Sequence, residues 1–130
     1  MAEGSIEGGL QHLISSLQAG RFTPVAPSSS VGSTARQCEL EPASVSYVRR
    51  SAGWNDVSVR YSITLRRSGE VSFEVMKELI GEANGLYGVV QASKNATYEV
   101  SGDASYDWDY EAGTALTMAV NITHNQRSGT

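Results

Sequence analysis

The feature that most constrains the fold of this chain is the strict alternation of apolar and polar residues in DVSVRYSITLR, residues 56–66. Every second residue from Val57 to Leu65 is apolar, and the residues between them are polar or charged. Successive side chains of a β-strand point to opposite faces, so this period of two predicts a strand with one buried and one solvated face.

Three short segments that end in glycine, 51–53, 67–69 and 111–113, separate such alternating runs. We interpret each as a three-residue hairpin loop, the first with its glycine in the left-handed region, because that loop length brings apolar residues together on one face. The expected pairs are Tyr47–Val57 and Val45–Val59; Leu65–Val71, Ile63–Phe73 and Tyr61–Val75; and Trp108–Leu116, Tyr106–Met118 and Ala104–Val120. The three registers agree with one another, which supports a sheet built of hairpins.

Apolar residues at helical spacing predict two helices. The first covers residues 6–17, with Ser5 as its N-cap. The second runs from Met76 to Tyr87 or Val90, and its charged residues lie mostly on the other side of the helix. Between the first helix and the first strand, the segment 22–34 (FTPVAPSSSVGST) is rich in serine, threonine and proline, which is typical of an irregular arm.

The expected fold is α+β, with the order helix, arm, β-β-β-α-β-β. Its core is a five-stranded antiparallel sheet with one helix packed on a face. Residues 1–35 form the N-terminal helix and arm, and residues 36–130 form a single α+β domain. A chain of 130 residues with 40% hydrophobic content has enough apolar material for one ordinary core.

Charge is distributed unevenly along the chain. The formal net charge is −4 at pH 7, which argues against general attraction to nucleic acid or to an anionic membrane. Residues 36–67, however, hold six arginines against three acidic residues, a local charge of +3. From residue 95 onward, five acidic residues face one arginine, a local charge of −4.

Two charged groups are therefore candidate interaction sites. The basic group, a candidate interface or nucleic-acid face on and beside the alternating strand, comprises Arg49, Arg50, Arg60, Arg66 and Arg67. The acidic group, a candidate partner-binding strip, comprises Asp103, Asp107, Asp109 and Glu111. The acidic residues occupy alternate positions of a straight strand, so they line up instead of converging as calcium ligands do. We expect no bound metal or cofactor, and we expect the basic strand of one copy to meet the acidic strip of another.

Catalytic motifs are lacking in the sequence. No G-x-S-x-G elbow, P-loop, dinucleotide fingerprint or H-E-x-x-H occurs. Cys38, the only cysteine, would need a base to act as a nucleophile, and the sequence places neither His12 nor His124 beside it. We therefore expect a protein that is not an enzyme.

The leading hypothesis is a self-associating structural or binding protein, most sharply a subunit of a viral or phage particle. A hairpin-rich sheet that bears arginines resembles in style the small RNA-phage coat proteins, although the helices are placed differently. The alternatives are an adaptor or chaperone-like module that binds another protein through a sheet edge or helix groove, and a small enzyme. No signal peptide and no apolar run of roughly 18 residues occurs, so we expect a soluble cytoplasmic or virion protein without a membrane partner.

Overall fold

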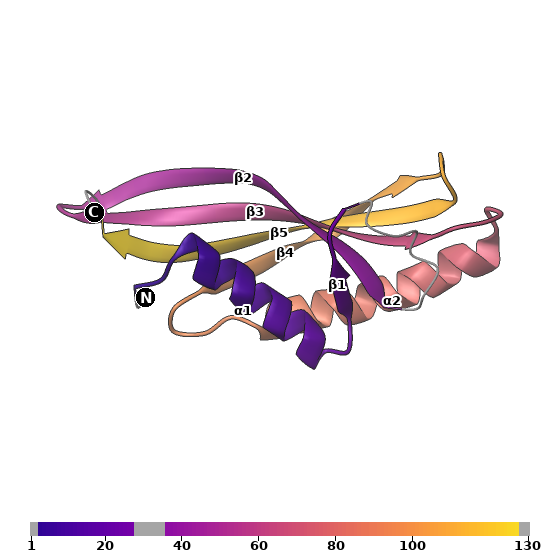
Figure 1. Ribbon diagram of the computed structural model, residues 1–130, viewed down its shortest axis with the longest axis horizontal. Helices are drawn as coiled ribbons and strands as arrows, with labels where there is room; N and C mark the ends of the chain where they lie inside the picture. The colour runs from indigo at the N-terminus through magenta and orange to yellow at the C-terminus, as the bar shows by residue number, and fades with distance from the viewer. Residues whose placement is uncertain (1–2, 28–35, 128–130) are drawn as a thin grey trace.

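The computed structural model describes residues 3–27 and 36–127, which form a sheet with two helices against one of its faces (Figure 1). In chain order, the elements are α1 (Ile6–Ala19), β1 (Thr23–Val25), β2 (Gln37–Ser51), β3 (Trp54–Arg67), α2 (Phe73–Ala92), β4 (Glu99–Asp109) and β5 (Thr114–Arg127). The sheet order is β1-β2-β3-β5-β4. The α+β class is confirmed.

The hairpin of β2 and β3 has the predicted register. Tyr47 lies opposite Val57 and Val45 opposite Val59, and Gly53 closes the turn with a φ of +83°. A bulge at residues 42–44 inserts one residue into β2 and so reverses which positions point toward the helices. As a result Leu40 before the bulge and Val45 after it lie on the same face.

The hairpin predicted at residues 67–69 is wrong. After Arg67 the chain turns into α2, and the hydroxyl of Ser72 caps that helix by accepting from the Val75 N–H at 3.2 Å. The alternation in residues 71–75 fits a strand, but the apolar positions of 75–90 extend the same segment into a longer amphipathic helix. The place expected for this strand, beside β3, is taken by β5.

The predicted arm instead supplies the fifth strand. Residues Thr23–Val25 form β1, which pairs in parallel with the start of β2, Thr23 opposite Gln37. The sheet is therefore mixed at this edge instead of wholly antiparallel. Most of the remaining arm, residues 28–35, lies outside the described part of the chain.

The hairpin of β4 and β5 is confirmed near its loop and wrong farther away. Trp108 lies opposite Leu116 and Tyr106 opposite Met118, as predicted, but Gly102, not Ala104, is the partner of Val120. From Gly102 to Tyr106, β4 advances by four residues while its partner β5 advances by only two, so β4 contains two extra residues there. Because the insertion is an even number of residues, the even positions of β4 stay on the helix side.

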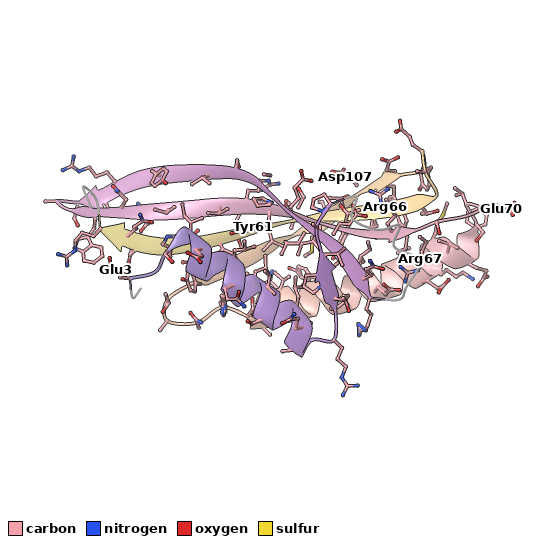
Figure 2. The ribbon with its side chains drawn as sticks, in the orientation of Figure 1. Glu3, Tyr61, Arg66, Arg67, Glu70 and Asp107 are labelled. Atoms are coloured by element: carbon pink, nitrogen blue, oxygen red, sulfur yellow. The ribbon has the colours of Figure 1, made fainter. Side chains whose placement is uncertain are left out.

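Both predicted helices are confirmed, and α2 continues to Ala92. The Ser5 hydroxyl caps α1 by accepting from the Gly8 N–H at 3.0 Å. The alternating strand β3 directs its odd positions toward the helices, and Tyr61 among them is almost completely buried (Figure 2). The core therefore lies in one layer between the sheet and the helices, and neither described helix covers the opposite sheet face.

Candidate interaction surfaces

The uncovered face of the sheet carries charged side chains and rows of short hydroxyl side chains. Hydroxyl pairs join β3 to β5: Ser58 to Thr123 at 2.8 Å, and Thr64 to Thr117 at 2.9 Å. Cross-strand pairs of this kind add roughly 0.2–1 kcal/mol each to sheet stability. We call this surface the open face.

The candidate arginines of the open face are paired with carboxylates of the same chain. The Arg60 guanidinium lies 3.2 Å from Asp103, and that of Arg66 lies 2.7 Å from Glu39. The basic strand and the acidic strip, which we expected to meet between copies, thus meet within one chain at Arg60 and Asp103. These pairs offset much of the positive charge that a phosphate backbone would require.

The other candidate arginines are dispersed. Arg50 pairs with Asp56 at 2.5 Å near the β2–β3 turn, and Arg49 is exposed at the same end of β2. Arg67 does not belong to the basic group as predicted, because it is only 8% exposed and forms an ion pair with Glu82 of α2. Figure 2 shows Arg66 on the open side of the sheet and Arg67 toward α2. The five arginines therefore do not form one basic surface.

Three residues of the predicted acidic strip, Asp103, Asp107 and Asp109, lie on β4, an edge strand that is bulged between Gly102 and Tyr106, whereas Glu111 lies in the turn after it. Asp103, Asp107 and Asp109 are exposed, and an Asp109 carboxylate oxygen accepts from the Glu111 N–H at 2.9 Å. No group of three or more histidine, cysteine or acidic side chains converges on one point in residues 3–27 and 36–127. The strip therefore has the geometry of a solvated or partner-facing row.

The chain's one thiol is poorly suited to nucleophilic chemistry. Cys38 is fully buried in β2, and burial raises the pKa of its thiol to about 12, which keeps it protonated near neutral pH. His12 contacts the Ser93 carbonyl at 2.6 Å and stacks on Tyr98, and Tyr98 in turn packs edge-on against the buried His124. Both histidines thus have structural partners where α1 meets the sheet.

The outer edge of β2 is the first surface that the sequence pattern did not reveal. β1 covers Gln37–Glu39, and residues 41–51 are all exposed. Three apolar side chains of this stretch project into solvent, Val45 at 46%, Tyr47 at 59% and Val48 at 49% exposure. We call residues 43–48 (ASVSYV) the edge surface.

The second surface lies at the other end of the molecule, where α2 begins and β4 ends (Figure 1). Ile80 and Trp108 line a groove of about 140 Å³ between α2 and β4, and the Trp108 ring stacks on that of Tyr110. Phe73, which is 79% exposed, lies two turns before Ile80 on the same side of α2. We call Phe73, Ile80, Trp108 and Tyr110 the end patch.

A larger groove of about 250 Å³ adjoins the edge surface. It is lined by Leu10, Ile14, Pro24, Val25, Ala26, Leu40 and Pro42. Pro42 ends this groove one residue before the edge surface begins, and Pro42 and Val45 lie on the same face of β2. The two therefore form a nearly continuous apolar strip from α1 to Tyr47.

Comparison of the chain with protein-family models and with curated proteins finds no match. Neither α1 nor α2 combines the length and the apolar character that crossing a bilayer requires, within the described residues.

Proposed function

We propose that this protein is a structural subunit that associates with copies of itself, and in the sharpest version a subunit of a viral or phage particle. The observation that carries the proposal is the presence of two exposed apolar surfaces, the edge surface and the end patch, at opposite ends of the molecule. Large exposed apolar patches typically mark interaction sites. A molecule with two such sites can extend an assembly beyond a dimer.

The open face gives little support to contact with nucleic acid. Because Arg60 and Arg66 are paired with Asp103 and Glu39, nucleic acid would have to displace ion pairs that are already formed. Contact with nucleic acid through this face is therefore a weaker candidate than contact between proteins. Loss of salt-dependent RNA or DNA binding in Arg60→Ala/Arg66→Ala would support the nucleic-acid role.

Light scattering coupled to size-exclusion chromatography tests the proposal directly. We expect a mass above that of the 13.9 kDa chain at micromolar concentration, and a larger mass at higher concentration. A strict monomer across that range would contradict self-association.

A second candidate is an adaptor that binds an extended segment of another protein along the edge surface. The unpaired strand favours it, since main-chain hydrogen bonds to an exposed edge bind peptides in many recognition domains. An adaptor is expected to be monomeric alone, so the same chromatography distinguishes the two candidates.

A further inference from the structure

The two edges of the sheet differ in how they are protected against pairing: β4 forms one edge, and β2 forms the other beyond the three residues that β1 covers. Natural edge strands carry charges, prolines or bulges that block a second strand. β4 has alternate acidic residues and the bulge between Gly102 and Tyr106. On β2 these features lie only at the two ends of the edge surface, with Pro42 and the bulge at residues 42–44 on one side and Arg49 and Arg50 on the other. The edge surface itself has no charged residue, no proline and three exposed apolar side chains. Between its protected ends, the edge surface is therefore the strand edge that most needs a partner.

The sequence of the edge surface is complementary to itself when run antiparallel. If Ser46 lies on a two-fold axis, Val45 of one copy stands opposite Tyr47 of the other, and the reverse pair forms as well. These four side chains gather on the helix side of the sheet, because Val45 and Tyr47 share that face. Aromatic and β-branched residues form favourable cross-strand pairs.

The same register accounts for the third exposed apolar residue. On the open face it places Val48 of each copy opposite Ser44 of the other, with the two Ser46 side chains adjacent at the axis. One contact thus covers Val45, Tyr47 and Val48, which no described element of the chain covers.

The residues at the ends of the paired segment are also compatible with this register. Pro42 has no N–H to donate, so regular pairing stops at the bulge. In this register Ala52, at the tip of the second copy's hairpin, reaches the level of Leu40, just beyond the residues that pair with β1.

We infer that β2 pairs antiparallel with β2 of a second copy through residues 44–48, about a two-fold axis at Ser46, joining the two sheets into one. This inference rests on the proposed self-association and specifies one of its contacts. A two-fold contact uses the same surface on both copies, which is the commonest symmetry among oligomers. The unprotected edge disappears in the dimer because each copy covers the other.

Cysteine cross-linking at the axis tests the register. In Ser46→Cys, the two introduced thiols are directly opposite, at a separation that a disulfide spans. We expect mild oxidation to convert this variant almost completely to a covalent dimer. The matched control is Ser105→Cys, an exposed serine on β4, which we expect to stay largely uncross-linked. The native Cys38 is buried and is not expected to react in the folded protein.

A second variant tests whether the disulfide forms through the proposed contact or through random collision of exposed thiols. Tyr47→Lys in the Ser46→Cys background places a charge in the apolar cluster, and we expect covalent dimer formation to slow at least tenfold. Tyr47 is 59% exposed, so the substitution leaves the fold intact, which circular dichroism checks.

The possible outcomes separate the inference from the proposed function. If the wild-type protein is oligomeric but Ser46→Cys does not cross-link, the β2 contact is wrong and self-association stands. A disulfide that forms preferentially between Ser46→Cys and Ser105→Cys in a mixture means that β2 pairs with β4, which overturns the two-fold contact. A wild-type monomer with no cross-linking removes both.

Discussion

Glycines at two hairpin turns show how local backbone geometry and packing combine at the level of single residues. Gly53 and Gly113 both have φ values in the left-handed region, +83° and +91°. A Cβ atom at Gly53 would meet nothing within 4 Å, whereas one at Gly113 would lie 2.2 Å from the Arg67 carbonyl oxygen. The β4–β5 turn is therefore packed against the end of β3, and the β2–β3 turn is free.

Alanine substitution should separate these two effects. We expect Gly53→Ala to lower the free energy of unfolding by about 1 kcal/mol, the cost of the left-handed conformation alone. Gly113→Ala also forces backbone atoms apart, so we expect a loss of about 3 kcal/mol or more. Urea unfolding monitored by tryptophan fluorescence measures both. Equal losses would contradict the contact between the turn and β3.

The buried thiol of Cys38 should make the free energy of unfolding depend on pH in the alkaline range. The folded-state pKa of its thiol is about 12, against 9.0 for an unperturbed thiol. Above pH 9 the unfolded chain releases this proton and the folded chain keeps it, so stability falls as pH rises. We expect the wild type to lose about 1.4 kcal/mol more than Cys38→Ala between pH 8 and pH 10.

That pH window avoids most of the contribution of the buried tyrosines. Burial also raises the pKa of Tyr61 and Tyr106 from 10.0, and these groups lower stability mainly above that pH. They are present in both proteins, so they cancel in the comparison. Parallel pH profiles for the wild type and Cys38→Ala would contradict the assignment.

At the scale of elements, the sequence predicts local pairings well and long-range ones poorly. The β2–β3 register follows from side-chain alternation and a short loop, so Tyr47–Val57 is predictable from adjacent residues alone. Residues 71–75 fit both a strand and the first turn of a helix, and the decision depends on the whole of α2. β1 has only three residues and pairs with a segment beyond the arm, so no local pattern identifies it.

The candidate site was only partly predictable for the same reason. Alternation shows that Val45 and Val57 share a face, but not that the helices cover Val57 and leave Val45 exposed. The ion partners of the arginines lie far away in sequence, such as Asp103 for Arg60. Composition revealed the charges, and only the fold revealed that they neutralise one another.

The N-cap of α2 provides a test of why residues after Arg67 form a helix instead of a strand. The Ser72 hydroxyl satisfies the Val75 N–H at the first turn, and a cap of this kind contributes about 1 kcal/mol. We expect Ser72→Ala to lower the free energy of unfolding by that amount, and Ser72→Asp to retain it. Ser105→Ala, on the exposed edge of β4, serves as the control and should change stability by less than about 0.5 kcal/mol. Equal effects at the two serines would contradict the capping role.

At the scale of the whole molecule, the helices leave two apolar parts of the fold uncovered. They pack over the middle of one sheet face, so the outer part of β2 and the junction of α2 with β4 stay exposed (Figure 1). The edge surface has main-chain donors and acceptors to share, whereas the end patch offers side chains and a groove. These surfaces therefore suit different contacts, one by strand pairing and one by apolar packing.

Charged substitutions in each surface should distinguish the contributions of the edge surface and the end patch to assembly. Ile80 is 48% exposed on α2, so Ile80→Lys adds charge to the end patch without disturbing the core. Suppose that the edge surface forms dimers and the end patch joins those dimers. Ile80→Lys should then reduce the assembly to a dimer, and Tyr47→Lys should also give a smaller species. The double variant should be monomeric. Light scattering measures the three masses. Lys77, one turn before Ile80 and already charged, provides the matched control, since Lys77→Glu tests whether any change of charge on α2 has the same effect. An unchanged mass in Ile80→Lys would mean that the end patch takes no part in the assembly. The edge surface alone would then produce a two-fold dimer and nothing larger.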